Sequence, residues 1–390
     1  MVEYNPYAYE IHEDPYPTYR RMRDEAPVYR NDELGFWALS HHADVLAGFK
    51  DVKRLSSRFG VSLDPEAFGE EASDNMSFLA MDPPRHTRLR SLVSAGFTPR
   101  RVAALEPRIR EISTRYIRTL VEQQSCEFVA DFAGKLPMDV VSELLGVPGE
   151  DRDDLRSWAE LLVHREEGAS GLPQAALDAA LELASYFAGM LEDRRKRPQN
   201  DLTSELLVAE LDGERLADRD VIGFLFLMIV AGNETTTKLL ANAIYWLWRN
   251  PGERDRLRDD PGLIPRWVEE TIRFDNSTQA LTRLVTRDFE LHGEKLREGD
   301  KLVLLIGSAN RDERVWTEPD RYDILRDTSA MLSFGKGTHF CLGAALARLE
   351  ARVALEEFQR RLPDYEIDPS GIERIHSVNV RGFAKLPVGW

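Results

Sequence analysis

Apolar residues recur at spacings of three and four along several long stretches of the chain. This spacing places them on one face of an α-helix, which a globular protein buries. The pattern predicts helices over 14–26, 106–124, 173–197 and 261–274.

Shorter stretches are rich in β-branched and aromatic residues, with Gly and Asp at turn positions. They predict strands within 27–40, 282–307 and 377–388. Because the helical pattern covers much more of the chain, the predicted fold class is mainly α with small β-sheets.

The most apolar stretch is "VIGFLFLMIVA" at 221–231, inside a helix predicted to run from near Asp218 to about Asn250. The run is well short of the ~20 residues that a membrane span needs. We therefore expect a buried core helix, roughly 50 Å long. The first fifteen residues are polar and acidic, unlike an export signal. A cytoplasmic protein with no membrane contact is expected.

The composition is that of an ordinary globular chain, with 43% hydrophobic and 30% charged residues among 390. No linker, low-complexity tract or repeat marks a join, so we expect a single domain over 1–390. The 67 acidic and 51 basic residues give a net charge of −16, which disfavours nucleic acid and anionic lipid. A small-molecule partner and a monomeric chain are expected.

The chain has two cysteines, Cys126 and Cys341, far apart in the sequence. In a reducing compartment a structural disulfide between them is the weaker interpretation. Cys126 lies in an amphipathic stretch and is interpreted as a small buried hydrophobe without a function. His339 and Cys341 supply only two of the four ligands of a structural zinc site, so zinc is not expected.

Cys341 lies in the glycine-rich loop "FGKGTHFCLG" at 334–343, before a stretch that predicts a long helix. At a helix N-terminus the macrodipole and the free backbone amides favour a thiolate. Gly335, Gly337 and Gly343 would let a flat ligand lie against the loop. A thiolate there suits a haem iron, and a buried core cysteine beside a glycine turn explains the loop equally well.

The loop resembles the haem-binding loop of the cytochrome P-450 superfamily, F-x-x-G-x-x-x-C-x-G, and further motifs of this family follow across nearly the whole chain. The resemblance implies the cytochrome P-450 fold, with haem b between the long central helix and the helix after the cysteine. It also implies that Cys341 is the axial ligand of the haem iron. The haem contacts implied in the loop are Phe334, Gly335, His339, Cys341 and Gly343.

A second motif, "AGNETTT" at 231–237, puts an acid and hydroxyls into the apolar central helix. Such groups are costly there unless something polar uses them. The alternative is a helix that reaches the surface, with threonines bonding backward to carbonyls. The motif resembles the oxygen-binding helix of the family. This implies that Ala231 and Gly232 contact the haem, that Gly232 gives room for O2 and that Glu234 and Thr235 relay protons.

Glu270 and Arg273 share one helix face through their spacing of three. The pair resembles the structural E-x-x-R motif of the family, and the segment "PDRY" at 319–322 looks like its partner. The resemblance implies that Arg321 is the third member of a triad that holds the core near the haem.

The segment "MDPPRHTRLR" at 81–90 carries His86 and Arg90 one helical turn apart. They look like two of the haem-propionate ligands of the family, and Arg283 and His339 occupy the other two matching positions. Taken singly, each of these basic residues would be interpreted as part of a solvated surface. Together they imply a propionate site.

The resemblance to soluble bacterial members implies a haem-thiolate monooxygenase, an oxidoreductase of EC 1.14 type and of secondary metabolism. It would insert one oxygen atom from O2 into a medium-sized apolar substrate, by hydroxylation or epoxidation. The sequence has no flavin, nicotinamide or iron–sulfur fingerprint, so electrons from NAD(P)H are implied to come through a ferredoxin and its reductase. The expected ferredoxin docking face comprises Arg90, Lys336, Arg348 and Arg352.

Two alternatives stay open: a non-catalytic haem-fold protein that binds a ligand or activates a partner, and a peroxide-driven oxygenase of the same fold. The substrate itself is not identified by the sequence. A terpenoid, steroid, fatty acid or polyketide would suit the expected pocket. The pocket walls are expected from 62–80, 161–187, 275–281 and 378–380.

Overall fold

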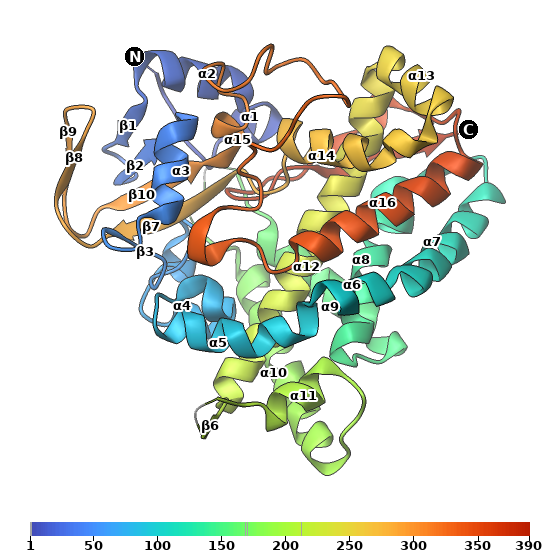
Figure 1. Cartoon of the computed structure of the whole chain (residues 1–390), viewed down its shortest axis with the longest axis horizontal. Helices are drawn as coiled ribbons and strands as arrows, with labels where there is room; N and C mark the ends of the chain where they lie inside the picture. The colour runs from blue at the N-terminus through green and yellow to red at the C-terminus, as the bar shows by residue number, and fades with distance from the viewer. Residues whose placement is uncertain (1, 168, 170, 212) are drawn as a thin grey trace.

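A computed structural model describes residues 2–167, 169, 171–211 and 213–390 (Figure 1). The helices are α1 (Tyr9–Glu13), α2 (Tyr16–Glu25), α3 (His42–Lys50), α4 (Ala72–Met76), α5 (Arg85–Ser94), α6 (Pro99–Ala104), α7 (Glu106–Val121), α8 (Lys135–Leu145), α9 (Arg152–Val163), α10 (Gln174–Lys196), α11 (Leu202–Val208), α12 (Asp218–Arg249), α13 (Pro251–Asp259), α14 (Ile264–Phe274), α15 (Ile306–Ala309) and α16 (Ala344–Arg361).

The strands are short and far fewer residues lie in them than in helices, which confirms the predicted fold class. They are β1 (Val28–Asn31), β2 (Phe36–Leu39), β3 (Leu55–Ser56), β4 (Ser125–Glu127), β5 (Glu210–Leu211), β6 (Glu214–Arg215), β7 (Ala280–Val285), β8 (Phe289–Leu291), β9 (Glu294–Leu296), β10 (Lys301–Leu305), β11 (Glu366–Ile367), β12 (Glu373–Arg374), β13 (Phe383–Lys385) and β14 (Pro387–Gly389).

The four predicted helical stretches are confirmed as α2, α7, α10 and α14, and the predicted strand regions contain β1, β2, β7 to β10, β13 and β14. Cys126 lies buried in β4, as expected, and burial raises the pKa of its thiol to about 12. Several helices that the sequence did not single out, among them α3, α5 and α8, complete the shell around the core.

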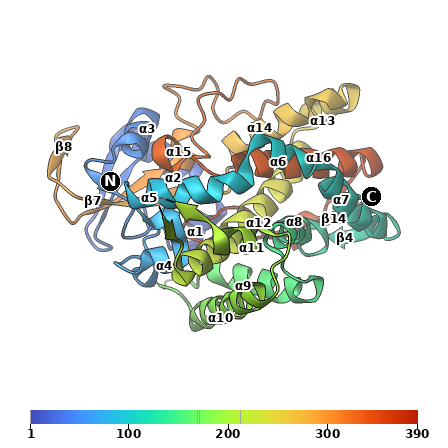
Figure 2. The same cartoon turned by 60° about the horizontal axis from the view of Figure 1, so that its bottom comes forward.

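Helix α12 is the centre of the fold. It packs against α4, α8, α9, α10, α14 and α16, and Figure 2 shows α9 and α10 on one side of it and α14 and α16 on the other. By length and composition α12 could cross a membrane, but 67% of its most apolar window is buried inside the fold. A helix that is apolar all round is stable when neighbours cover it on every side. The expectation of a buried core helix is confirmed.

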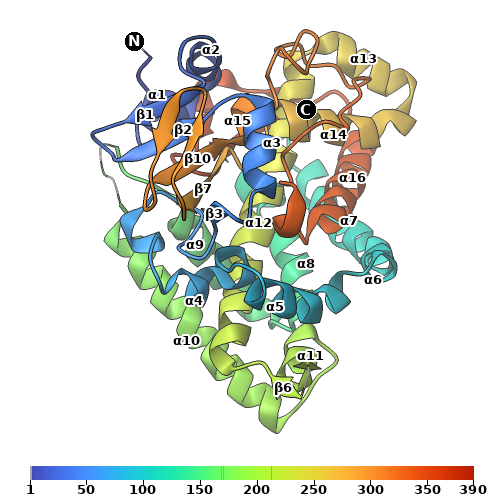
Figure 3. The ribbon, with the colours of Figure 1, turned by 60° about the vertical axis from the view of Figure 1, so that its left-hand side comes forward.

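The main β-sheet lies at one end of the molecule, beside α2, α3 and α15 (Figure 3). Its strand order is β1-β2-β10-β7-β3. β10 runs parallel to β2, with Lys301 opposite Phe36, and the other neighbouring strands are antiparallel. This order places β7 between β10 and β3 and thereby fixes the position of Arg283.

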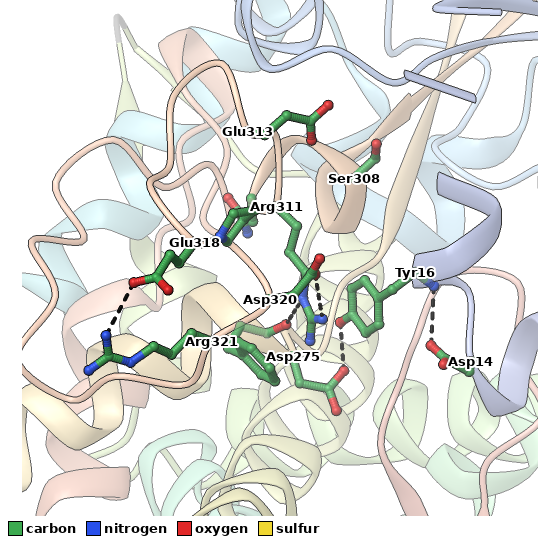
Figure 4. A network of polar contacts seen from close by, with 12 residues as sticks. Asp14, Tyr16, Asp275, Ser308, Arg311, Glu313, Glu318, Asp320 and Arg321 are labelled. Atoms are coloured by element: carbon green, nitrogen blue, oxygen red, sulfur yellow. Dashed lines mark hydrogen bonds and ion pairs between the residues drawn. The ribbon is translucent and has the colours of Figure 1, made fainter. Parts of the chain in front are cut away.

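A buried carboxylate joins distant parts of the chain. Asp275 accepts hydrogen bonds from the Tyr16 hydroxyl (2.7 Å), Arg381 Nε (2.7 Å) and Trp246 Nε1 (2.8 Å), and Arg374 lies 3.6 Å away. Figure 4 shows Tyr16 and Asp275 in this network. Burial alone would raise the pKa of Asp275, but the two arginines and the hydrogen bonds hold it well below its usual range. The carboxylate is therefore ionised and ties α2, α12 and the C-terminal segment together.

Candidate active site

The cysteine loop has a backbone that two of its glycines make possible. Gly335 and Gly337 have φ values of +67° and +75°, a region that favours glycine. A Cβ on Gly337 would lie 3.0 Å from the carbonyl oxygen of Phe49 at the end of α3. The amide of Cys341 donates to the carbonyl oxygen of Phe334 at 2.9 Å. These contacts hold the loop closed, with Cys341 three residues before the first residue of α16.

Cys341 is exposed at the surface of its loop. The loop itself lies among other parts of the protein, and this burial raises the pKa of the thiol. The amides of Gly343 and Ala344 and the charges of Arg90 and Arg348 lower it by less. The amides at the start of α16 therefore act in the predicted direction, but burial outweighs them, and the net effect in the protein without haem is a raised thiol pKa. A metal ion that bonds to the sulfur would displace its proton.

Four basic residues gather close to this loop: His86 and Arg90 of α5, Arg283 of β7, and His339 of the 3₁₀ turn Gly337–His339. The rings of His86 and His339 are 4.2 Å apart. Within the part of the chain that the structure describes, neither Arg90 nor Arg283 forms an ion pair. Arg90 donates to the Phe340 carbonyl oxygen at 2.5 Å, and Arg283 to that of Thr282 at 2.7 Å. The structure thus brings the four predicted residues together.

The electrostatics of this cluster favour an anion. Burial and then neighbouring positive charge lower the pKa of His86 to about 4 and that of His339 to about 3, so both imidazoles are neutral at pH 7. Burial also lowers the pKa of Arg283 to about 10, against the attraction of Asp82. Both ring nitrogens of His86 and Nδ1 of His339 are buried without a hydrogen-bond partner. Buried polar atoms of this kind usually have partners, and a carboxylate could accept a hydrogen bond from the one N–H that the neutral His86 ring carries.

Helix α12 presents small and hydroxyl side chains on one face. Ala231 is exposed, Gly232 and Thr235 are half-buried, and a Cβ on Gly232 would meet only Val141, at 3.6 Å. The Thr235 hydroxyl donates to the carbonyl oxygen of Ala231 at 2.7 Å. This is the backward bond considered as an alternative from the sequence, and it occurs on an accessible face. Figures 1 and 3 show the start of α16 beside α12.

The side chain of Glu234 is buried, in contrast to that of Thr235. Its Oε2 lies 3.3 Å from Nζ of Lys238, with only 3% and 2% of the Lys238 and Glu234 side chains exposed, and its Oε1 accepts from Asn233 at 3.2 Å. Lys238 was missed by the sequence analysis. The spacing of four between an acid and a lysine in an apolar helix is the signal that could have found it.

The donor set fits a haem. An accessible thiol at a helix start, a wall of small residues on α12 and a cluster of two arginines and two histidines without acidic partners match an iron porphyrin with two carboxylates. The buried imidazole nitrogens without partners are the observation that favours the fit. Phe334 and Gly343 flank the thiol in the sequence, and Gly343 precedes the first residue of α16.

The E-x-x-R pair is present, but its predicted third member is wrong. Arg273 forms two hydrogen bonds to Glu270, at 2.7 and 2.8 Å, and both side chains are fully buried. Arg326 completes the group with Nε 3.3 Å from Glu270 Oε1. Arg321 instead pairs with Glu318 at 3.2 Å and is half exposed (Figure 4). The reason is that the backbone oxygen of Arg321, and not its side chain, faces Arg273 and Arg326 and accepts hydrogen bonds from both.

Two arginines of the predicted docking face are engaged within the chain. Arg348 forms two hydrogen bonds to Glu269, at 2.5 and 2.9 Å. Arg352 pairs with Glu106 at 2.6 Å and Glu356 at 2.8 Å. Lys336 is half-buried and forms no ion pair in the described ranges.

The segments expected to line a pocket lie together. The backbone amide of Gln279 donates to the carbonyl oxygen of Asn379, and the amide of Arg381 donates to that of Ser277. These two bonds join 275–281 to 378–380. Arg165 binds Asp64 through a buried ion pair at 2.7 Å and reaches the carbonyl oxygen of His376 through its backbone amide at 2.8 Å. The ion pair joins 62–80 to the helical region around 161–187.

The chain is similar to known proteins in sequence and in fold. The sequence profile of the family described as Cytochrome P450 matches residues 263–372. The chain is 54% identical to the putative cytochrome P450 123 of Mycobacterium tuberculosis, over 98% of this chain and 96% of that protein. Its fold is similar to cytochrome P450 CYP109Q5 from Chondromyces apiculatus, with a TM-score of 0.90, 36% identity and coverage of 100% and 98%. It is also similar to CYP109E1 from Bacillus megaterium in complex with testosterone, with a TM-score of 0.91, 33% identity and coverage of 97% and 98%.

We predict that Arg326→Met destabilises the protein more than Arg321→Met. Arg326 donates to a buried carboxylate, and a hydrogen bond to a charged group contributes about 1.5–3 kcal/mol. Arg321 makes exposed ion pairs, whose loss costs less than about 1 kcal/mol. Urea unfolding of both variants measures the two losses. Equal destabilisation would contradict the assignment of Arg326 as the third member.

Proposed function

Because the chain belongs to the cytochrome P450 family, we propose that Cys341 is the axial ligand of its haem iron and that the accessible face of α12 borders the reaction site. The chain is a cytochrome P450 monooxygenase that uses haem and O2. The observation that carries the proposal is the exposed thiol of Cys341 in a loop that Gly335 and Gly337 hold closed at the start of α16.

His86, Arg90, Arg283 and His339 would hold the haem carboxylates. Arg90 and Arg283 have no acidic partner in the described part of the chain, and the free imidazole nitrogens of His86 and His339 offer further hydrogen bonds. Phe334, Gly335 and Gly343 would support the ring from the loop, and Ala231 and Gly232 from α12. When bound, haem supplies the activation of O2 and the transfer of one oxygen atom to the substrate.

Thr235 and Glu234 are the proposed proton relay, with Lys238 as a positioning residue. The Thr235 hydroxyl can hold a proton at Oγ1 while it accepts from an ordered water. The ion pair with Lys238 Nζ fixes Glu234 Oε2 inside the fold. Glu160 of α9 is exposed and lies near enough to Glu234 for that charge, after burial, to raise the pKa of its carboxyl, so we place Glu160 at the outer end of the proposed path. Protons would pass from Glu160 toward Glu234 and on to Thr235 through water and side-chain rotation.

We propose a medium-sized apolar substrate of steroid dimensions. The support is the likeness to CYP109E1, whose structure holds testosterone. The buried Arg165–Asp64 pair would close one wall without offering a free charge to the ligand. If no steroid tested changed the absorption spectrum of the haem, the proposal of a steroid-sized substrate would be contradicted.

We propose a ferredoxin and its reductase as electron donors, a cytoplasmic location, a monomeric state and a single domain over 1–390. The free cysteines Cys126 and Cys341 suit a reducing compartment. Docking is proposed at Arg90, Lys336, Arg348 and Arg352, beside the cysteine loop. Of these, Arg90 and Lys336 form no ion pair within the described ranges, and because Arg90 is assigned to the haem carboxylates, Lys336 is the charge that remains available for docking.

The first test concerns the iron ligand. Reduced wild-type protein with carbon monoxide should show the red-shifted Soret band of a thiolate-ligated haem, and Cys341→Ser should lose it. Cys126→Ser is the matched control, because it changes the other thiol and should leave the band in place. A normal red-shifted band in Cys341→Ser would overturn the assignment.

The relay predicts uncoupling. Thr235→Ala and Glu234→Gln should keep the haem but lower product formed per NAD(P)H consumed, with peroxide released, because a lost general acid costs roughly 100-fold or more. Lys238→Met should lower the same ratio by freeing Glu234. Thr235→Ser keeps the hydroxyl and should restore most of the product yield. Wild-type yield in Thr235→Ala and Glu234→Gln would mean that protons arrive by another route.

The docking face predicts an effect of charge on electron transfer. Lys336→Glu should slow reduction by a ferredoxin severalfold at low salt, and the difference should shrink at high salt because screening weakens the attraction. Lys196→Glu, the same charge change at the exposed end of α10, is the control. Equal rates in the two variants would remove Lys336 from the docking face. Arg348→Glu is less informative because it also breaks the pair with Glu269.

A further inference from the structure

Three metal-ligand side chains meet at the surface, away from the cysteine loop. They are His41, directly before α3, Asp44 in the first turn of α3, and His292 in the turn between β8 and β9. His292 Nε2 lies 2.9 Å from Asp44 Oδ2, and His41 Nδ1 lies 3.6 Å from the same oxygen. All three ligand atoms are within 4.8 Å of one another. None of these residues has a role in the haem chemistry.

The hydrogen bonding of His41 orients it as a ligand. Its Nε2 is 2.8 Å from the carbonyl oxygen of Arg23. A carbonyl oxygen only accepts, so Nε2 carries the hydrogen and the neutral ring has its lone pair at Nδ1, the nitrogen beside the Asp44 carboxylate. A lone pair and a carboxylate repel each other unless Nδ1 is protonated or a metal cation lies between them. Metal-bound histidines commonly donate their second N–H to a backbone carbonyl in this way.

The hairpin turn positions His292. His292 and Gly293 form a two-residue turn with φ values of +51° and +86°. Both positions of such a turn need a positive φ, which histidine adopts more often than most residues. From this turn the side chain of His292 reaches back to Asp44 of α3.

We propose that His41 Nδ1, Asp44 Oδ2 and His292 Nε2 bind a divalent transition-metal ion, best matched by Zn2+, that fastens the β8–β9 hairpin to α3. Two imidazoles and one carboxylate are ligands that zinc accepts in tetrahedral sites, with water as the fourth ligand. Zinc bonds of about 2.0–2.1 Å place neighbouring ligand atoms about 3.3 Å apart in a tetrahedron. The separations of 2.9 and 3.6 Å to Asp44 bracket this value.

Imidazole also binds Cu2+ and Ni2+, whereas Mg2+ and Ca2+ prefer all-oxygen sites. The proposed site should therefore bind Zn2+ more tightly than Mg2+ or Ca2+, whereas a simple acidic surface would bind Mg2+ and Ca2+ as readily as Zn2+. The ordinary alternative is an ion pair between Asp44 and a protonated His292, with no metal. The experiment has to separate the two.

The test is Zn2+ binding to the tag-free, haem-loaded protein after removal of metals with a chelator, measured by isothermal titration calorimetry. Wild type should bind one Zn2+ per chain and gain thermal stability with it. His292→Asn and Asp44→Asn should each weaken binding at least tenfold, since even outer-shell changes cost about 10–100-fold. Asparagine suits a positive φ, so His292→Asn keeps the turn. His164→Asn, a change at another exposed histidine, should bind like wild type.

An unchanged haem absorption spectrum and an unchanged unfolding temperature without Zn2+ would verify that His292→Asn is folded. If that variant were unfolded, Asp44→Asn would carry the test. No binding at 100 µM Zn2+ would overturn the proposal and leave the ion pair alone. Equal affinity in wild type and the His292 and Asp44 variants would also overturn it. Mg2+ binding as tight as Zn2+ would show a non-selective acidic surface and overturn it too.

Discussion

The structure depends on burying most of α12 while its middle carries polar groups. An apolar helix of this length becomes stable when neighbouring helices cover it, and here α4, α8, α9, α10, α14 and α16 are among the helices that contact it. This coverage makes each polar side chain on the buried faces need a partner within the fold. Glu234 finds Lys238 and Asn233, and Thr235 finds the Ala231 carbonyl.

The same constraint separates two neighbouring residues of one motif. Thr235 lies on the accessible face and Glu234 in the interior, because adjacent helix residues point about 100° apart. The lysine fixes the position of the buried carboxylate, whereas the hydroxyl on the open face can meet a substrate or water. In the proposed relay, the helix thereby separates the buried acid from the accessible hydroxyl.

Much of the architecture could be predicted from the sequence. The period of apolar residues located α2, α7, α10, α12 and α14, because that period reflects burial of one face or of the whole helix. The resemblance to a family predicted that four basic residues lie together: His86, Arg90, Arg283 and His339. The sequence alone could not predict this contact, because the residues are far apart in the chain, on α5, on β7 and in the cysteine loop.

The parts that could not be predicted depend on contacts through space. Arg326 replaced Arg321 because the backbone turns the Arg321 carbonyl, and not its side chain, toward the buried pair. The pKa of the Cys341 thiol is raised because the effect of burial is larger than the combined effect of two backbone amides and two arginines, which lower it. The group of His41, Asp44 and His292 spans about 250 residues and requires knowledge of where the β8–β9 hairpin folds back.

The network around Asp275 has a consequence for synthesis of the chain on the ribosome. Its carboxylate is buried against Trp246 and Tyr16, which emerge earlier, but its cationic partners Arg374 and Arg381 come later, Arg381 by 106 residues. Until these arginines have left the ribosome, burial of Asp275 would leave a carboxylate without a cationic partner, which is unfavourable. We therefore expect Tyr16 and Trp246 to reach their final packing around Asp275 only once the C-terminal segment has been synthesised.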